Sequence, residues 1–182
     1  MPLFVCIEGL DATGKTSVSQ ALAPHLGAYY YKSPGGPYAE ARRIVDEVVD
    51  PITRYFFYRA AVQYDSNIIR GLLQNGSVVC DRYIYSTIVC HAAMDERIQG
   101  LFETTGLVMP DYVFVLTANE DVRMRRLAGR LSVSAMEKNL LLQRKIDQLF
   151  RMQGHPVIDT THTQVEDIVE TILGYLGGGA ST

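Results

Sequence analysis

Residues 9–17 hold the side chains whose types and spacing are best suited to chemistry. Gly9, Gly14, Lys15 and Thr16 fill every fixed position of the pattern G-x-x-x-x-G-K-[ST]. The glycines let the backbone curl so that its N–H groups point at phosphate oxygens, and a helix that starts here adds positive potential. The sequence therefore predicts a phosphate-binding loop. Its other expected nucleotide contacts are Ala12, Thr13 and Ser17.

Two side chains of this loop and one distant carboxylate indicate a place for a metal ion. Lys15 is expected to reach the β- and γ-phosphates of a nucleotide, and the Thr16 hydroxyl to bind Mg²⁺. Asp81 ends an apolar, strand-like run. It either binds the metal or caps the next helix. We favour the metal role because Mg²⁺ at such a loop needs a second anionic partner.

Segments typical of strands and helices alternate along the chain. Apolar runs predict strands at 2–8, 28–32, 77–81, 111–117 and 155–159, and apolar stripes with caps predict helices at 15–26, 51–76, 83–94, 119–130 and 161–176. This alternation indicates a parallel sheet covered on both faces, with ligands at the carboxyl ends of its strands. The strand-end residues of interest are Glu8, Lys32, Asp81 and Asp159.

Two details of the predicted helices are open to a direct check. Pro24 should kink or shorten the last turn of the helix at 15–26. The buried stripe of the helix at 51–76 is expected to consist of Ala61, Ile68, Ile69, Leu72 and Leu73. Residues 33–37, SPGGP, are predicted to form a loop.

Length and composition limit the class of protein. The 182 residues fit one domain, which we assign to 1–176, with 177–182 as a flexible tail. A net charge of −3 argues against a broad surface for polymeric nucleic acid. Neither a signal peptide nor a membrane span is indicated, and the three scattered cysteines do not form a disulfide or metal pattern. We expect a soluble protein of the reducing cytoplasm.

The order of motifs along nearly the whole chain resembles the thymidylate kinase family. FVCIEGLDATGKT, KSPGGPYAEARR, DRYIYSTIVCHA, PDYVFVL and RRLAGR follow one another as the family's E-G-[LI]-D, R-E-P-G-G and D-R-Y-x-x-S motifs and its short helical lid do. The resemblance implies an α/β P-loop sandwich with five parallel strands, a lid at about 130–143 and a homodimer. It implies ATP with Mg²⁺ as donor and a nucleoside-monophosphate-like acceptor.

The same resemblance gives roles to individual residues. Lys15 and Thr16 would serve the donor, and Asp11 would face the acceptor near the reacting phosphates. Arg82 resembles the arginine that holds the acceptor phosphate, a role suited to a planar fork that is always charged. Ser86 follows the D-R-Y motif and is expected at the acceptor too.

Two further residues have a structural alternative. Phe57 falls where the family stacks an aromatic ring on the acceptor base, although core packing explains an aromatic residue on an amphipathic helix equally well. His91 stands where bacterial members often place a glutamine near the base, although a lone histidine on a helix is more often a packing or surface residue.

Departures from the family pattern are expected to change the base specificity. Lys32 and Ser33, before Pro34, replace the arginine and glutamate of R-E-P, so that bidentate geometry and a carboxylate are lost. Ala61 replaces the arginine that contacts the base ring, which leaves room beside Phe57. Arg59 lies two residues away on the helix and therefore points elsewhere.

A second departure concerns the catalytic arginine. The family has it in the phosphate-binding loop, at the position of Ala12, or in the lid. Residues 131–143 contain no arginine. The candidates to act on the transferring phosphoryl group are therefore Arg126, Arg130 and Arg144.

Three functions other than that of a nucleoside monophosphate kinase are possible for a protein with a phosphate-binding loop. A GTPase switch would need a guanine-reading N-K-x-D motif, which the sequence lacks. A nucleotide-binding protein without turnover is disfavoured by the intact Lys15, Thr16 and Asp81. A kinase of the same fold that phosphorylates a hydroxyl, in a nucleoside or a specialised metabolite, remains the alternative. Arg82 favours a phosphate acceptor, because a hydroxyl needs no phosphate clamp.

Overall fold

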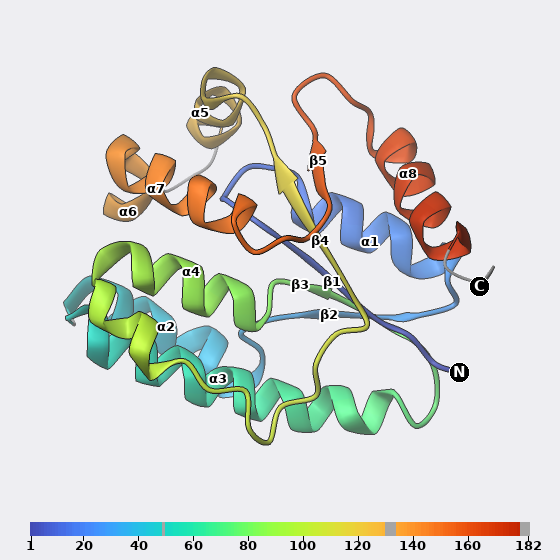
Figure 1. Ribbon diagram of the computed structural model, residues 1–182, viewed down its shortest axis with the longest axis horizontal. Helices are drawn as coiled ribbons and strands as arrows, with labels where there is room; N and C mark the ends of the chain where they lie inside the picture. The colour runs from blue at the N-terminus through green and yellow to red at the C-terminus, as the bar shows by residue number, and fades with distance from the viewer. Residues whose placement is uncertain (49, 130–133, 179–182) are drawn as a thin grey trace.

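The computed structural model describes residues 1–48, 50–129 and 134–178, and a parallel β-sheet forms its centre (Figure 1). The strands lie in the order β2-β3-β1-β4-β5, and each neighbouring pair is parallel. Their bounds are β1 Phe4–Gly9, β2 Tyr29–Lys32, β3 Val78–Asp81, β4 Tyr112–Thr117 and β5 Val157–Asp159. The predicted fold class and the five predicted strands are confirmed.

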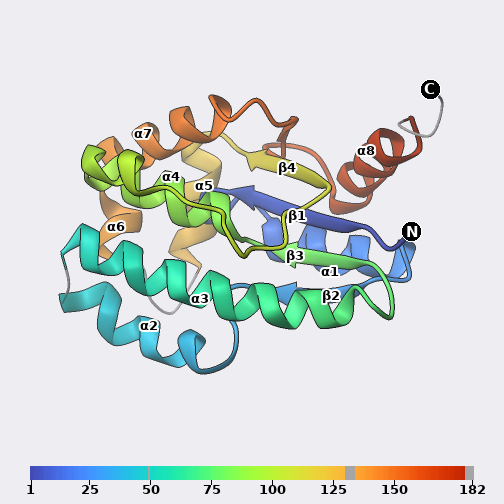
Figure 2. The same ribbon diagram turned by 60° about the horizontal axis from the view of Figure 1, so that its bottom comes forward.

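Helices cover both faces of this sheet. They are α1 Lys15–His25, α2 Gly36–Val48, α3 Pro51–Leu72, α4 Ile84–Met94, the 3₁₀ helix η1 Glu96–Leu101, α5 Glu120–Ala128, α6 Ala135–Lys138, α7 Leu140–Arg151 and α8 Val165–Gly178. Figure 2 shows α2 alongside α3, which it contacts. No helix in the described ranges is long and apolar enough to cross a membrane.

The alternation of side chains along β1 divides the core between the two faces of the sheet. Val5 and Ile7 pack with residues of α1 and α8, whereas Phe4 and Cys6 pack with residues of α3 and α4. A third cluster joins α4 and α7 through Leu10, which directly follows β1. Successive strand residues point to opposite faces, so an almost fully apolar strand needs helices on both.

The helices α2 and η1 are not predicted by the sequence, and one predicted core residue is wrong. The helix α2 begins at Gly36, inside the expected loop. The helix α6 lies within the expected helical lid at about 130–143, and α7 begins in that range but continues to Arg151. Ile68 is 39% exposed, because Asp65 and Ser66 are the buried residues of that turn of α3. Pro24 lies in the last turn of α1, which ends at His25. The helix α8 continues to Gly178, two residues into the expected tail; residues 179–182 lie outside the described ranges.

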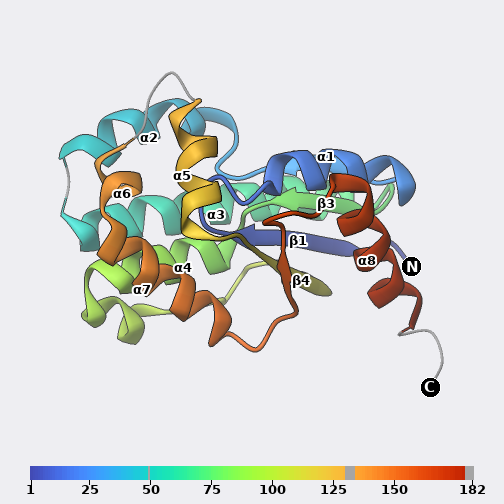
Figure 3. The ribbon, with the colours of Figure 1, turned by 90° about the horizontal axis from the view of Figure 1, so that it is seen from above.

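The register of the strands brings their carboxyl ends together at one edge. Asp81 is paired with Ile7 on one side and with Lys32 on the other, and Thr117 is paired with Asp159. Figure 3 shows α5 and α6 grouped at the end of the molecule toward which β1 points, with the N-terminus at the opposite end. Residues that are far apart in the sequence therefore meet beyond the end of β1.

Candidate active site

The segment between β1 and α1 has the backbone geometry of a phosphate-binding loop. Gly9, Ala12 and Gly14 have positive φ angles of 130°, 63° and 93°. A Cβ at Gly9 would lie 2.1 Å from the carbonyl oxygen of Leu116, so only glycine allows β1 to run this close to β4. Thr13 Oγ1 donates to the Leu10 carbonyl at 2.9 Å, and Ser17 lies exposed in the first turn of α1. The loop therefore turns its backbone toward the N-terminus of α1, where an anion is favoured.

The Lys15 side chain is buried inside this loop. Its ammonium donates to the carbonyl oxygen of Leu10. Burial and the nearby charge of Arg82 lower the pKa of Lys15 to about 7. An anion placed in the loop would favour the charged form of this lysine, so the site is built to gain from binding phosphate.

Thr16 and Asp81 form the part of the site that fits a metal ion. Thr16 Oγ1 donates to Asp81 Oδ2 at 2.5 Å, and the Lys32 ammonium lies 3.0 Å from both of these oxygens. Asp81 Oδ1 is buried, and no hydrogen-bond partner is found for it in the described part of the chain. Asp81 does not cap α4, whose N-cap is Tyr83. A carboxylate oxygen without a partner, beside a hydroxyl, is a donor set that would suit Mg²⁺ together with phosphate oxygens.

The charge state of Asp81 agrees with this assignment. Burial acts to raise its pKa, but the hydrogen bond from Thr16 and the positive charges of Lys15 and Lys32 outweigh burial and hold the pKa below its usual value. Asp81 is therefore ionised at neutral pH. Among the described residues no group of three or more His, Cys, Asp and Glu side chains could hold a metal, so the rest of the ligands would be phosphate or water.

Arg82 is held over the loop by three contacts. Its guanidinium donates to the Asp11 carboxylate at 2.6 Å, to the Gly9 carbonyl at 3.0 Å and to Ser86 Oγ at 2.9 Å. Its backbone has a positive φ of 68°, an uncommon conformation for a residue with a side chain. The structure thus brings Asp11, Arg82 and Ser86 together beside Lys15, as the sequence predicts.

The predicted base-reading residues lie in an aromatic layer between α2, α3 and α4. Phe57 is half-buried, with its ring centre 5.4 Å from that of Tyr38. His91 is 3% exposed and lies 5.2 Å from the Tyr58 ring; its Nδ1 is 2.6 Å from the Thr87 carbonyl. Its Nε2 is buried without a hydrogen-bond partner among the described residues. Burial lowers the pKa of His91 to about 4, so the ring is neutral at pH 7.

The side chains at the family's R-E-P position turn in two directions. Lys32 contacts Thr16 and Asp81, whereas Ser33 is buried and donates to Asp65 Oδ2 at 2.6 Å. Pro34 follows Ser33 and is half-buried. Asp65 also accepts from the Tyr31 hydroxyl at 2.6 Å and from the Gly35 N–H at 3.0 Å. This buried carboxylate anchors the loop, a role that sequence reasoning missed. The available signal was a charged residue on the buried stripe of α3.

Ala61 and Arg59 both belong to α3. Ala61 is fully buried, so its methyl group presents no surface to an acceptor in this conformation. Arg59 donates to the carbonyl oxygens of Glu103 and Thr105, away from the phosphate-binding loop.

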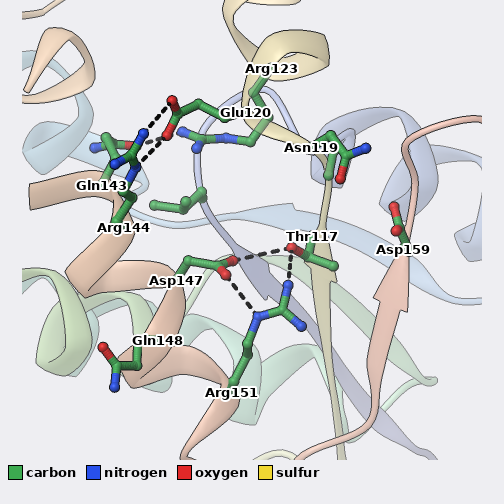
Figure 4. A pocket seen from close by; sticks show the side chains of 12 residues that line it. Thr117, Asn119, Glu120, Arg123, Gln143, Arg144, Asp147, Gln148, Arg151 and Asp159 are labelled. Carbon is green, nitrogen blue, oxygen red and sulfur yellow. Dashed lines mark hydrogen bonds and ion pairs between the residues drawn. The ribbon is translucent and has the colours of Figure 1, made fainter. Parts of the chain in front are cut away.

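The three candidate arginines differ in where they lie. Arg126 donates to the Ala12 carbonyl at 3.2 Å and to the Thr160 carbonyl at 2.8 Å, so it lies against the loop. Arg144 pairs with Glu120 at 2.9 Å on the wall of a neighbouring cavity (Figure 4). Arg130, with residues 131–133 of the expected lid, lies outside the described residues.

Arg123 also reaches the loop, and the sequence analysis missed it. Its Nε donates to the Asp11 carbonyl at 3.0 Å, from the same helix as Arg126. The available signal was its spacing of four residues from Leu127, which places an arginine on the buried side of α5.

A phosphate-binding loop after the central β1, with a carboxylate at the end of β3 and an arginine directly after it, defines a P-loop nucleotide kinase. Comparison with known proteins gives the family. The family model described as Thymidylate kinase matches residues 7–172, and the chain belongs to this family.

Individual relatives extend over nearly the whole chain. A probable thymidylate kinase of Methanocaldococcus jannaschii is 29% identical, covering 96% of this chain and 95% of the relative. The mitochondrial UMP-CMP kinase 2 of Homo sapiens is 29% identical over 94% of this chain and 42% of its own length. The solved thymidylate kinase of Candida albicans has the same fold, with a TM-score of 0.80 at 19% identity, covering 98% of this chain and 92% of that chain.

The buried, neutral His91 makes a prediction about stability and pH. Its pKa falls from an ordinary value of 6.5 to about 4 on folding, so the unfolded chain binds the proton first. The free energy of unfolding should therefore fall as the pH drops from 6.5 toward 4, by about 2 kcal/mol from this group at pH 5. His91→Gln should remove this part of the pH dependence. Urea unfolding of both proteins at pH 7 and pH 5 measures it, and equal losses in the two would contradict the assignment.

Proposed function

We propose that the protein transfers the γ-phosphoryl group of ATP to the phosphate of a nucleoside monophosphate. The position of Arg82 carries this proposal. Its guanidinium lies 2.6 Å from the Asp11 carboxylate and 3.0 Å from the Gly9 carbonyl, beside the phosphate-binding loop, which supports a role in holding an acceptor phosphate. The P-loop holds the donor, and a hydroxyl acceptor would have no use for a second phosphate clamp.

Positioning and charge supply most of the catalysis in such a reaction. Lys15 would bind the β- and γ-phosphates, and Thr16 with Asp81 would hold Mg²⁺, which neutralises charge on the phosphates when bound. The Lys32 ammonium lies 3.0 Å from both Thr16 Oγ1 and Asp81 Oδ2. When a metal is bound there, Lys32 would move toward the acceptor phosphate. Arg126, at the carbonyl of Ala12, is the described arginine best placed to act on the transferring group.

We further propose that thymidylate is not the preferred acceptor. The family's base-reading arginine is replaced by Ala61, and Ser33 is turned inward to Asp65. Losing one hydrogen bond to a charged group costs about 1.5–3 kcal/mol, which corresponds to roughly ten- to a hundred-fold in affinity. The relatives named above include a thymidylate kinase and a UMP-CMP kinase, so proteins similar to this chain are named for different bases. This supports an acceptor base other than thymine.

A homodimer in the cytoplasm completes the proposal. Phe56, Ala60, Tyr64 and Ile68 are exposed on α3 at a spacing of four residues and form one apolar stripe. A stripe of this kind along a 22-residue helix suits packing against a second copy of the chain. The free thiols of Cys6, Cys80 and Cys90 suit a reducing compartment.

The donor role of Lys15 is tested by mutation. Lys15→Ala should lower ADP production with any monophosphate acceptor by at least about a hundred-fold, because a preorganised charge on the phosphates is lost. Lys145→Ala, which removes an exposed lysine of α7, is the matched control and should leave the rate unchanged. A folded Lys15→Ala protein with wild-type turnover would rule out the loop as the donor site.

The acceptor preference is tested by steady-state kinetics. We expect kcat/KM for thymidylate to lie at least about ten-fold below that for the best of the other pyrimidine and purine monophosphates, because the donor group at position 61 is missing. If thymidylate is the best acceptor, the interpretation of Ser33 and Ala61 is wrong. If nucleosides react and monophosphates do not, the phosphate-clamp role of Arg82 is wrong.

A further inference from the structure

Arg123 is a buried cation at the junction of three elements. It belongs to the first turn of α5 and is 5% exposed. Its Nε donates to the carbonyl oxygen of Asp11 in the phosphate-binding loop at 3.0 Å, and its Nη2 donates to Oε1 of Gln143 in α7 at 2.6 Å. The guanidinium therefore joins the loop to α7 directly.

The burial of this charge is not explained by an ion pair. Both partners of the guanidinium in the described part of the chain are neutral oxygens, and none of the ion pairs found there includes Arg123. Two other arginines line the same cavity, and both have carboxylate partners: Arg144 pairs with Glu120, and Arg151 with Asp147 (Figure 4). Burial lowers the pKa of Arg123 and outweighs the carboxylates of Asp11, Asp147, Glu120 and Glu137, which attract this charge without pairing with it. An uncharged side chain would be buried here at lower cost, so packing alone does not explain an arginine.

The contacts on either side of Arg123 extend the connection. Gln143 is buried, and its Nε2 donates to the Met136 carbonyl of α6 at 3.1 Å. On the other side, the carboxylate of Asp11 accepts from Arg82 at 2.6 Å. One chain of hydrogen bonds thus runs from α6 and α7 through Arg123 to the loop residue that holds Arg82.

We propose that Arg123 is a positioning residue for phosphoryl transfer: it fixes the loop at Asp11 and adds positive potential there. This rests on the proposed function. Arg123 acts through the Asp11 carbonyl, one residue before Ala12, where the loop has no arginine of its own. A cation fixed beside the loop favours the polyphosphate without touching it, and loss of the anchor lets Asp11 and Arg82 drift from the reacting groups.

The cavity beside Arg123 makes the proposal testable by chemical rescue. It has a volume of about 340 Å³, and Leu10 is among its lining residues. Arg123 and Gln143 line it as well (Figure 4). Truncation of Arg123 to alanine enlarges this space by the volume of the guanidinium group and two methylene groups. Added guanidinium ion can then occupy the vacated position and restore the contacts to Asp11 and Gln143.

The experiment compares kcat, KM and thermal unfolding of the full chain with its best monophosphate acceptor. We expect Arg123→Ala to lower kcat by about 10- to 100-fold, with KM for ATP changed less than about three-fold. Guanidinium chloride at tens of millimolar should restore kcat at least several-fold in Arg123→Ala and should not raise it in the wild type. Arg151→Ala, which removes the paired arginine of the same cavity, should keep wild-type kcat with and without guanidinium.

The outcomes separate this inference from the proposed function. A wild type that phosphorylates no monophosphate overturns both. An active wild type with Arg123→Ala within two-fold in kcat overturns the inference alone. A loss of kcat that guanidinium does not restore, accompanied by a lower midpoint of thermal unfolding, also overturns it, because Arg123 would then be purely structural.

Discussion

The buried carboxylate of Glu8 determines where the phosphate-binding groups lie. It accepts hydrogen bonds from the backbone N–H groups of Tyr83 at 2.9 Å and Ser86 at 3.1 Å, and from the Ser86 hydroxyl. Burial raises the pKa of Glu8 despite these bonds. An unpaired carboxylate in this position would be costly, so the first turn of α4 must meet the end of β1. Arg82, directly before the N-cap of that helix, has its left-handed conformation and lies over the loop.

Positive charge gathers at this edge of a chain whose net charge is −3. Among the described residues, the cations in contact with the loop or with Thr16 and Asp81 are Lys15, Lys32, Arg82, Arg123 and Arg126. They repel one another, and the charge of Arg82 contributes to the low pKa of Lys15. A polyphosphate placed among them removes this repulsion. This edge of the sheet therefore favours phosphate-bearing ligands although the chain as a whole is acidic.

Sequence reasoning found what depends on local pattern and missed what depends on tertiary contact. The loop glycines, Lys15 and the strand-end Asp81 follow from spacing, and the structure places them as expected. Asp65 and Arg123 were missed because a charged residue on a helix is expected to face solvent unless its buried partners are known. Both are buried in the structure. The helix α2 was missed because the glycines and prolines at 33–37 indicate a loop, whereas the helix starts within them.

The fate of the transferred phosphoryl group tests the central claim most directly. ATP labelled in its γ-phosphoryl group is incubated with the protein and an equimolar mixture of nucleoside monophosphates, thymidylate included, and their parent nucleosides, and the labelled products are identified by mass spectrometry. Because the role proposed for Arg82 is to hold an acceptor phosphate, we predict that the label appears in a nucleoside diphosphate, and most strongly in one other than thymidine diphosphate. Label found only in nucleoside monophosphates, or only in free phosphate, would contradict a phosphate acceptor.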